Sequence, residues 1–254
     1  MSKRFLIGFV VGFALMVVVG VGASRQKQKS VEDSEFQAEL EGATPVQVGV
    51  LTERQRMHSK LFSDFRQGDS QTIVELIAAY KEQKTVYRIS VDVNTPRLSA
   101  EVEAPESFFG KLAQESDAVI LGRVTSKVSQ ITEDGRFIFT DYDVTIKEAL
   151  KGHASAQLRA GTTINVTCPG GKVLIGNTIV KSGGNSIASL PLNNHDVVLF
   201  VKALPQAGDF KLARYDASFE LGDVSVTALA GMFPSSYLVD KYSFLETVRA
   251  AVSK

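Results

Sequence analysis

The chain has 254 residues, 44% of them hydrophobic and 22% charged, and its 28 basic residues balance its 28 acidic ones. This length allows one large domain or a medium-sized domain with appendages, and the apolar content is enough for a core. The balanced charge provides no overall field that would favour nucleic acid as a partner. A single cysteine excludes an internal disulfide, and with it a small disulfide-stapled fold.

The N-terminus predicts export across a membrane. Lys3 and Arg4 precede an uncharged apolar run from Phe5 to Ala23, which is the pattern of a signal sequence or a membrane anchor. At about 1.5 Å per residue, a helix of this run nearly matches the roughly 30 Å hydrocarbon core of a bilayer. A small-residue cleavage site before Ser24 keeps removal open, but the length favours an uncleaved anchor. The bulk of the chain is then expected at the membrane on its periplasmic or extracellular side.

Two glycines in the apolar run, Gly8 and Gly12, are candidate packing residues between membrane helices. Their four-residue spacing lets two helices approach closely. The alternative is that glycine is simply common in membrane segments.

Between this segment and the main domain, residues 24–44 are polar and predict a solvated linker. Residues 45–104 predict a helical pair followed by a strand. The first helix starts at Thr52, where Thr52-Glu-Arg-Gln55 fits a capping box. His58 lies on this helix with no second metal ligand nearby in the sequence, and we interpret it as an exposed or packed helix residue.

The second helix and the strand of this region follow from their periodicities. Apolar residues at helical spacing from Ile73 to Tyr80 predict a helix that starts after Asp69. Apolar and polar residues then alternate from Thr85 to Val93, as they do in a strand with one solvated face.

Residues 105–254 predict a β-rich domain with a C-terminal helix. A short helix from Pro105 leads into a strand at 119–128, a hairpin turn around Gly135 and a returning strand at 137–147. Ser243-Phe-Leu-Glu246 fits a capping box that opens the closing helix. Further strands are expected at 163–168, 173–175, 178–180, 197–201, 210–215 and 219–226.

Two aspartates on the returning strand, Asp141 and Asp143, are the first candidates for chemistry. Residues two apart on a strand point the same way, so an acid–base pair or a cation site is geometrically allowed. A solvated outer face with Lys147 as a neighbour explains them equally well, and a calcium site would need more oxygen ligands nearby. We therefore assign them no catalytic or metal-binding role.

Cys168 shares the apolar face of its predicted strand, where a thiol is normally inert. His153 and His195 lie in turn-like surroundings, which disfavours a Cys/His catalytic pair. The glycine-rich stretches at 169–172 and 181–185 lack the spacing of a phosphate-binding loop and are interpreted as hairpin and bulge positions. The sequence thus predicts no catalytic residue, no cofactor and no metal ligand.

Several short motifs occur in an order that resembles a domain of uncharacterised exported bacterial proteins. The resemblance covers roughly residues 105–254 and implies a small, closed or nearly closed β-barrel of the OB or netrin-like kind, with no established activity. The disulfides and N-terminal cysteine of netrin-like protease inhibitors are absent from this chain, so protease inhibition is not expected. The motifs are Ser116-Asp117, Gly122-Arg-Val124, Thr140-Asp-Tyr142, Leu150-Lys-Gly152, Pro169-Gly-Gly171 and Val198-Leu-Phe200.

Together these patterns predict an α+β chain whose main part is an antiparallel β-barrel with flanking helices, preceded by a hydrophobic membrane segment at 1–23. The favoured function is a binding or scaffolding module that is anchored in the membrane and meets an envelope protein or polymer, not nucleic acid. An extracytoplasmic hydrolase using some of Asp141, Asp143, Cys168 and His195 is one alternative. A structural subunit of a membrane complex, with Gly8 and Gly12 packing against another helix, is the other.

Overall fold

The structure is a computed structural model, and it describes residues 33–63, 71–80, 84–90, 104–152, 158–183, 189–205, 208–214, 217–229 and 240–253. The predicted membrane segment at 1–23, with Gly8 and Gly12, lies outside the described residues, as does His153. Within the described ranges, no helix has the length and apolar character needed to cross a bilayer.

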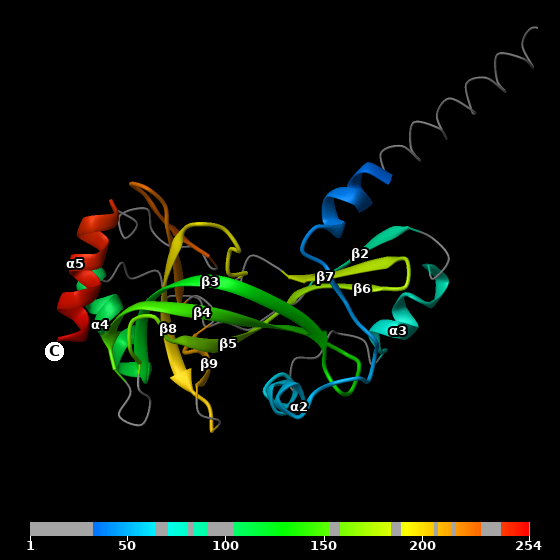
Figure 1. The fold of residues 1–254 in the computed structure, drawn as a ribbon, viewed down its shortest axis with the longest axis horizontal. Coiled ribbons are helices and arrows are strands. Elements are labelled where there is room, and N and C mark those ends of the chain that lie inside the picture. The colour runs from blue at the N-terminus through cyan, green and yellow to red at the C-terminus, as the bar shows by residue number, and fades with distance from the viewer. Residues whose placement is uncertain are drawn as a thin grey trace, which may run out of the picture.

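A closed five-stranded β-barrel forms the centre of the molecule (Figure 1). Strands β3, β4 and β5 form an antiparallel meander, β5 pairs in parallel with β9, and β9 and β3 both pair antiparallel with β8, which closes the barrel. The α+β class and the barrel are therefore confirmed. The bounds are β3 Ala118–Ile131, β4 Ile138–Lys151, β5 Thr163–Pro169, β8 Asp196–Ala203 and β9 Asp209–Leu212.

The barrel closes because alternate residues of its strands are apolar and fill the interior. Tyr142, Val166 and Phe210 show the pattern, since they are register partners on β4, β5 and β9 and all belong to one buried cluster. The residues between them on each strand therefore face outward. On β4, β5 and β9 that outward face is polar, and it carries the candidate site.

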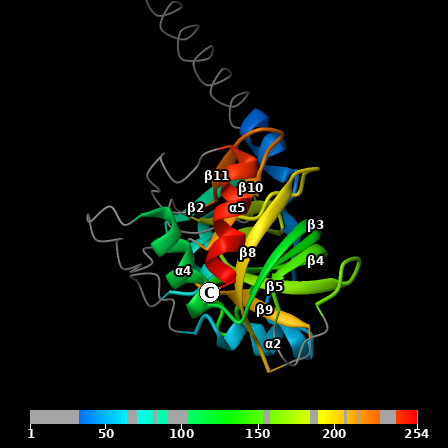
Figure 2. The ribbon, with the colours of Figure 1, turned by 90° about the vertical axis from the view of Figure 1, so that its left-hand side faces the viewer.

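Two helices and two further strands lie against the outer side of β3 and β8 (Figure 2). Helices α4 (Pro105–Glu115) and α5 (Lys241–Val252) pack against each other and, with β10 (Ser218–Leu221) and β11 (Val226–Ala228), enclose a cluster rich in phenylalanine. The predicted cap of α5 is wrong. Asp240 begins the helix by accepting hydrogen bonds from the amides of Tyr242 and Ser243, and its position before the first turn gives it the N-cap role expected for Ser243.

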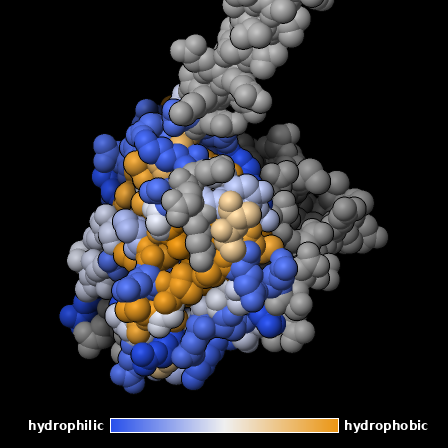
Figure 3. All heavy atoms as spheres, turned by 90° about the vertical axis from the view of Figure 1, so that its right-hand side faces the viewer, coloured by the Kyte–Doolittle hydropathy of each residue, from blue (hydrophilic) through white to orange (hydrophobic). Residues whose placement is uncertain are grey.

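A second, smaller sheet lies at the other end of the molecule. It has the order β1-β6-β7-β2, with β1 (Thr44–Pro45) parallel to β6 (Gly171–Ile175) and β2 (Thr85–Ser90) parallel to β7 (Thr178–Gly183). One face packs with helix α3 (Ile73–Leu76) and the tip of the β3–β4 hairpin around a cluster of isoleucines and valines. Seen from this end, the surface shows an apolar band bordered by hydrophilic residues (Figure 3).

Gly171 lets the chain pass from the barrel into this second sheet. Its φ of 145° is closed to other residues, and a Cβ there would collide with the hydroxyl oxygens of Thr140 and Ser129. Glycine is therefore required at position 171 by its backbone conformation and by the close approach of Thr140 and Ser129.

The N-terminal part of the described chain packs on both sheets. Helix α2 (Glu53–Lys60) begins with both hydrogen bonds of the predicted capping box at Thr52. Helix α3 is shorter than predicted and is followed by a turn of 3-10 helix, η1 (Ala78–Tyr80). The solvated linker predicted at 24–44 does not hold from residue 33 onward, because residues 33–40 are helical with Phe36 buried, and Thr44 and Pro45 form β1.

Candidate functional site

Helix α2 lies across the outer face of the barrel, and apolar residues on either side of it fix its position. Leu51 before the helix and Phe62 after it are buried. The Phe62 ring stacks on Phe137 and Phe139, with centroids 6.0 and 5.7 Å away. The helix itself, ERQRMHSK, is polar, and only His58 and Ser59 are buried along it. Its contact with the barrel is therefore made largely by polar side chains.

The barrel face under α2 is built from two rows of register partners. Asp143, Asn165 and Asp209 form one row across β4, β5 and β9. Asp141 and Thr167 lie next to each other in the second row, which Lys211 completes on β9. We call Asp141, Asp143 and Asp209 the acidic face. It opposes the buried core face of the same three strands, as the alternation of residues on a strand requires.

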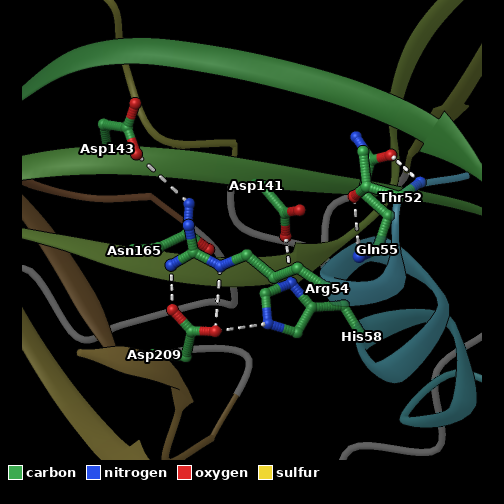
Figure 4. Close-up of polar contacts among 8 residues, drawn as sticks. All are labelled: Thr52, Arg54, Gln55, His58, Asp141, Asp143, Asn165 and Asp209. Atoms are coloured by element: carbon green, nitrogen blue, oxygen red, sulfur yellow. Dashed lines mark hydrogen bonds and ion pairs between the residues drawn. The ribbon is translucent and has the colours of Figure 1, made fainter. Parts of the chain in front are cut away.

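His58 connects two of these carboxylates. Its Nδ1 lies 2.8 Å from Oδ1 of Asp141 and its Nε2 lies 3.2 Å from Oδ2 of Asp209 (Figure 4). The His58 side chain is 1% exposed and those of the aspartates 9% and 2%. Each ring nitrogen of His58 therefore contacts the carboxyl group of a different aspartate.

Arg54, one turn before His58, is a second partner of Asp209. Its guanidinium binds Asp209 through two nitrogens, with Nε 2.9 Å from Oδ2 and the second contact reaching Oδ1. Arg54 and His58 of α2 together provide polar partners for both Asp141 and Asp209. Because buried charges are stable only when paired and hydrogen-bonded, this pairing holds the polar helix on the barrel.

Asp143 lies beside this pair and is satisfied by the barrel itself. It accepts hydrogen bonds from Ser126 Oγ at 2.6 Å and from Asn165 Nδ2 at 3.3 Å. Two polar atoms in the same rows, Asn165 Oδ1 and Thr167 Oγ1, are buried and have no hydrogen-bond partner in the part of the chain that the structure describes. The face thus retains hydrogen-bonding capacity that α2 does not use.

No protein-family model and no curated protein matches this chain. The function is therefore argued from the chemistry of the site.

The solvated face predicted for the two aspartates is wrong in part. Asp141 and Asp143 do point away from the core, but His58 of α2 covers Asp141, which is only 8% exposed, while Asp143 is partly buried beside Ser126 and Asn165. Lys147 does not neighbour them, because its ammonium pairs with Asp196 at 2.7 Å. The two-residue period of a strand predicted that both aspartates point outward, but it did not predict that α2 packs over Asp141.

His58 is a packed helix residue, which is one of the two alternatives predicted for it, but no sequence pattern indicated its partners. Asp141 is 83 residues and Asp209 is 151 residues away along the chain. The one feature of the sequence that could have drawn attention to this site was the histidine itself, His58, in a charged helix just after a capping box. Across the described ranges, the structure contains no group of three or more His, Cys, Asp or Glu side chains arranged to hold a metal ion.

The cysteine and the remaining histidine of the described chain lie apart from this site. Cys168 is fully buried in the barrel core, and burial together with the negative charge of Asp141 raises the pKa of its thiol far above the usual value. His195 precedes β8 with its side chain 45% exposed, and its Nδ1 lies 2.7 Å from Oε1 of Glu220. A buried thiol with a raised pKa is a poor nucleophile, so Cys168 acts as an apolar core residue.

Proposed function

We propose that the protein is an exported, membrane-anchored binding or scaffolding module of the cell envelope, built on a barrel of the OB or netrin-like kind. The apolar run at 1–23 supports the anchor. The strand connections support the barrel type. Three meandering strands, the third of them parallel to the fifth, close through the fourth onto the first, which is a five-stranded Greek-key arrangement of the OB type.

The observation that carries the binding function is the acidic face and the way it is occupied. Three carboxylates stand on adjacent strands of a rigid barrel wall, and two of them, Asp141 and Asp209, hold a polar helix through Arg54 and His58. A rigid wall with charges at fixed positions recognises a partner by electrostatic complementarity. The same wall bears buried oxygen atoms of Asn165 and Thr167 that have no hydrogen-bond partner among the described residues.

The hydrolase alternative would need its candidate residues to converge. Cys168 lies inside the barrel core, Asp141 and Asp143 lie on the opposite face of the same wall, and His195 is paired with Glu220. Asp141 itself is bound to His58. This separation favours binding over hydrolysis as the function of the domain.

In-cell crosslinking of the full chain tests the proposal, followed by mass spectrometry of every joined protein and of the chain's own N-terminal peptide. We expect one reproducible envelope partner and an intact apolar segment from Phe5 to Ala23. The partner should persist in a His195→Leu control, which changes an exposed histidine away from the acidic face. A mature chain that begins near Ser24 and carries no partner would contradict the anchored module.

A further inference from the structure

A second charged surface, on the small sheet, is occupied in the same manner as the acidic face but with the charges reversed. Arg88 on β2, Lys181 on β7 and Lys172 on β6 are register partners, so three cations lie side by side across three adjacent strands. We call these three residues the basic row. Like charges directly opposite each other on neighbouring strands repel, so the row requires an anion to be stable.

The anion is supplied by the helix at residues 33–40. The carboxylate of Glu39 lies 2.8 Å from Lys172, 3.1 Å from Lys181 and 3.4 Å from Arg88. Hydrogen bonds from Lys172 and Lys181 and their charges outweigh the cost of burial and lower the pKa of Glu39 from 4.5 to about 2. Glu35, one turn earlier on the same helix face, pairs with Arg88 at 2.6 Å.

The positive charge of this surface exceeds the paired negative charge. Lys127 on β3 lies beside Lys172, and burial together with the Lys172 charge lowers the pKa of its ammonium. Among the described residues it has no carboxylate partner. Four basic side chains therefore share two paired carboxylates: Arg88, Lys127, Lys172 and Lys181 against Glu35 and Glu39.

Within the described residues, helix 33–40 is held mainly by these ion pairs. Phe36 is its only buried residue, and the strand that follows it, β1, has two residues. Lys172 also donates to the backbone carbonyl oxygens of Glu39 and Glu41, at 3.0 Å each, at the end of the helix. The Arg88–Glu35 pair is about half exposed on both sides, and Lys181 is 43% exposed. Pairs of this kind weaken with salt and contribute little each, so the helix can be displaced at modest cost.

We propose that the basic row is a docking site for an acidic helical segment of a partner protein, and that helix 33–40 occupies this site until the partner replaces it. This inference rests on the proposed binding function and names the chemistry of the partner: carboxylates four residues apart on a helix, with an aromatic residue between them. The pattern is that of the bound segment itself, Glu35-Phe36 followed by Glu39.

The test uses the full chain in neutral detergent micelles and a fluorescent synthetic peptide with the sequence of residues 33–43. In the wild type, the chain's own helix competes, which reduces the apparent affinity by the fraction of molecules with a free site. The double variant Glu35→Gln/Glu39→Gln should bind the peptide about tenfold or more tightly than the wild type. The matched control Glu41→Gln removes one acidic charge from an exposed residue outside the ion pairs and should behave as wild type.

Adding Lys181→Gln and Arg88→Gln to the Glu35→Gln/Glu39→Gln variant should abolish peptide binding. Adding Arg56→Gln and Lys60→Gln instead, which change two exposed residues of α2, should not. Failure of a folded Glu35→Gln/Glu39→Gln chain to bind the peptide would overturn the proposal. Equally tight binding after Lys181→Gln and Arg88→Gln are added to that chain would overturn it as well.

Hydrogen exchange on the wild-type chain provides a test that needs no variant. Amides of residues 33–40 should exchange faster than those of β3, and salt should accelerate them selectively; equal protection of both would overturn the proposal. These measurements require no cellular partner. Failed crosslinking with successful peptide binding would therefore count against the proposed function alone, and the reverse result against the basic row alone.

Discussion

Replacing His58 by leucine should destabilise the protein strongly, because the histidine is buried between two carboxylates. The change removes the only hydrogen-bond partner that Asp141 has among the described residues, while Asp209 keeps Arg54. Breaking a buried ion pair costs about 3–5 kcal/mol, and the retained Arg54 contact places the expected loss near the lower end, at about 3 kcal/mol. For a chain of this size that corresponds to a fall in Tm of roughly 6–12 °C.

The assay is equilibrium urea unfolding of the full chain in neutral detergent, followed by circular dichroism. His195→Leu is the matched control, since that histidine is exposed with a single partner, and it should change the free energy of unfolding by less than about 1 kcal/mol. Adding Asp141→Asn to His58→Leu should recover part of the loss, because an unpaired amide is cheaper to bury than an unpaired carboxylate. A loss of stability below about 1 kcal/mol for His58→Leu, or no recovery in the double variant, would refute the stabilising role of the buried His58–Asp141 contact.

Three further predictions concern other residues. The folded-state pKa of Glu39 is lowered from 4.5 to about 2, so its contribution is complete above pH 4.5 and disappears as the pH falls through about 2. Glu39→Gln should therefore lower the free energy of unfolding at pH 7 by about 1–2 kcal/mol. The full pKa shift would be equivalent to roughly 3 kcal/mol, but solvent screens the cluster. A loss of stability that persists unchanged at pH 2 would contradict this prediction. Gly171→Ala should destabilise by about 3 kcal/mol or prevent folding, since the Cβ meets Thr140 at a φ closed to alanine; a Tm equal to wild type would show that the close approach does not exist. Cys168 should react with a thiol reagent only at the rate of unfolding, because its thiol is buried with a raised pKa, and rapid labelling of the native chain would be inconsistent with the barrel core.

The elements that local patterns could predict are those whose cause is local. The capping box at Thr52 is satisfied by side chains three residues apart, and the apolar face of Cys168 follows from the two-residue period of a strand. Each depends on neighbours within a few positions of the sequence.

The candidate site could not be predicted in the same way, because its parts are distant in sequence. Alternation showed that Asp141 points outward, but only the docking of α2 determines that it is buried against His58. Helix 33–40 was expected to be solvated because its composition is acidic, and the basic row that attracts Glu39 comes from three strands that the sequence does not place together.

The prediction of where α5 begins was wrong for a different reason. Two residues three apart, Asp240 and Ser243, both suit an N-cap, and the structure uses the first. Composition alone does not choose between two capping residues when both precede an apolar stripe.

Site-specific photocrosslinking in the cell can show whether the charged faces covered by the N-terminal segment receive a partner. A photoreactive residue at Glu41, beside the basic row, is compared with one at Val224, which is 76% exposed in the β10–β11 connection. We expect one defined partner to be joined at position 41 and not at position 224, and to be lost when Arg88 and Lys181 are changed to glutamine. The same products at both positions, or a partner at 41 that is indifferent to the basic row, would contradict it.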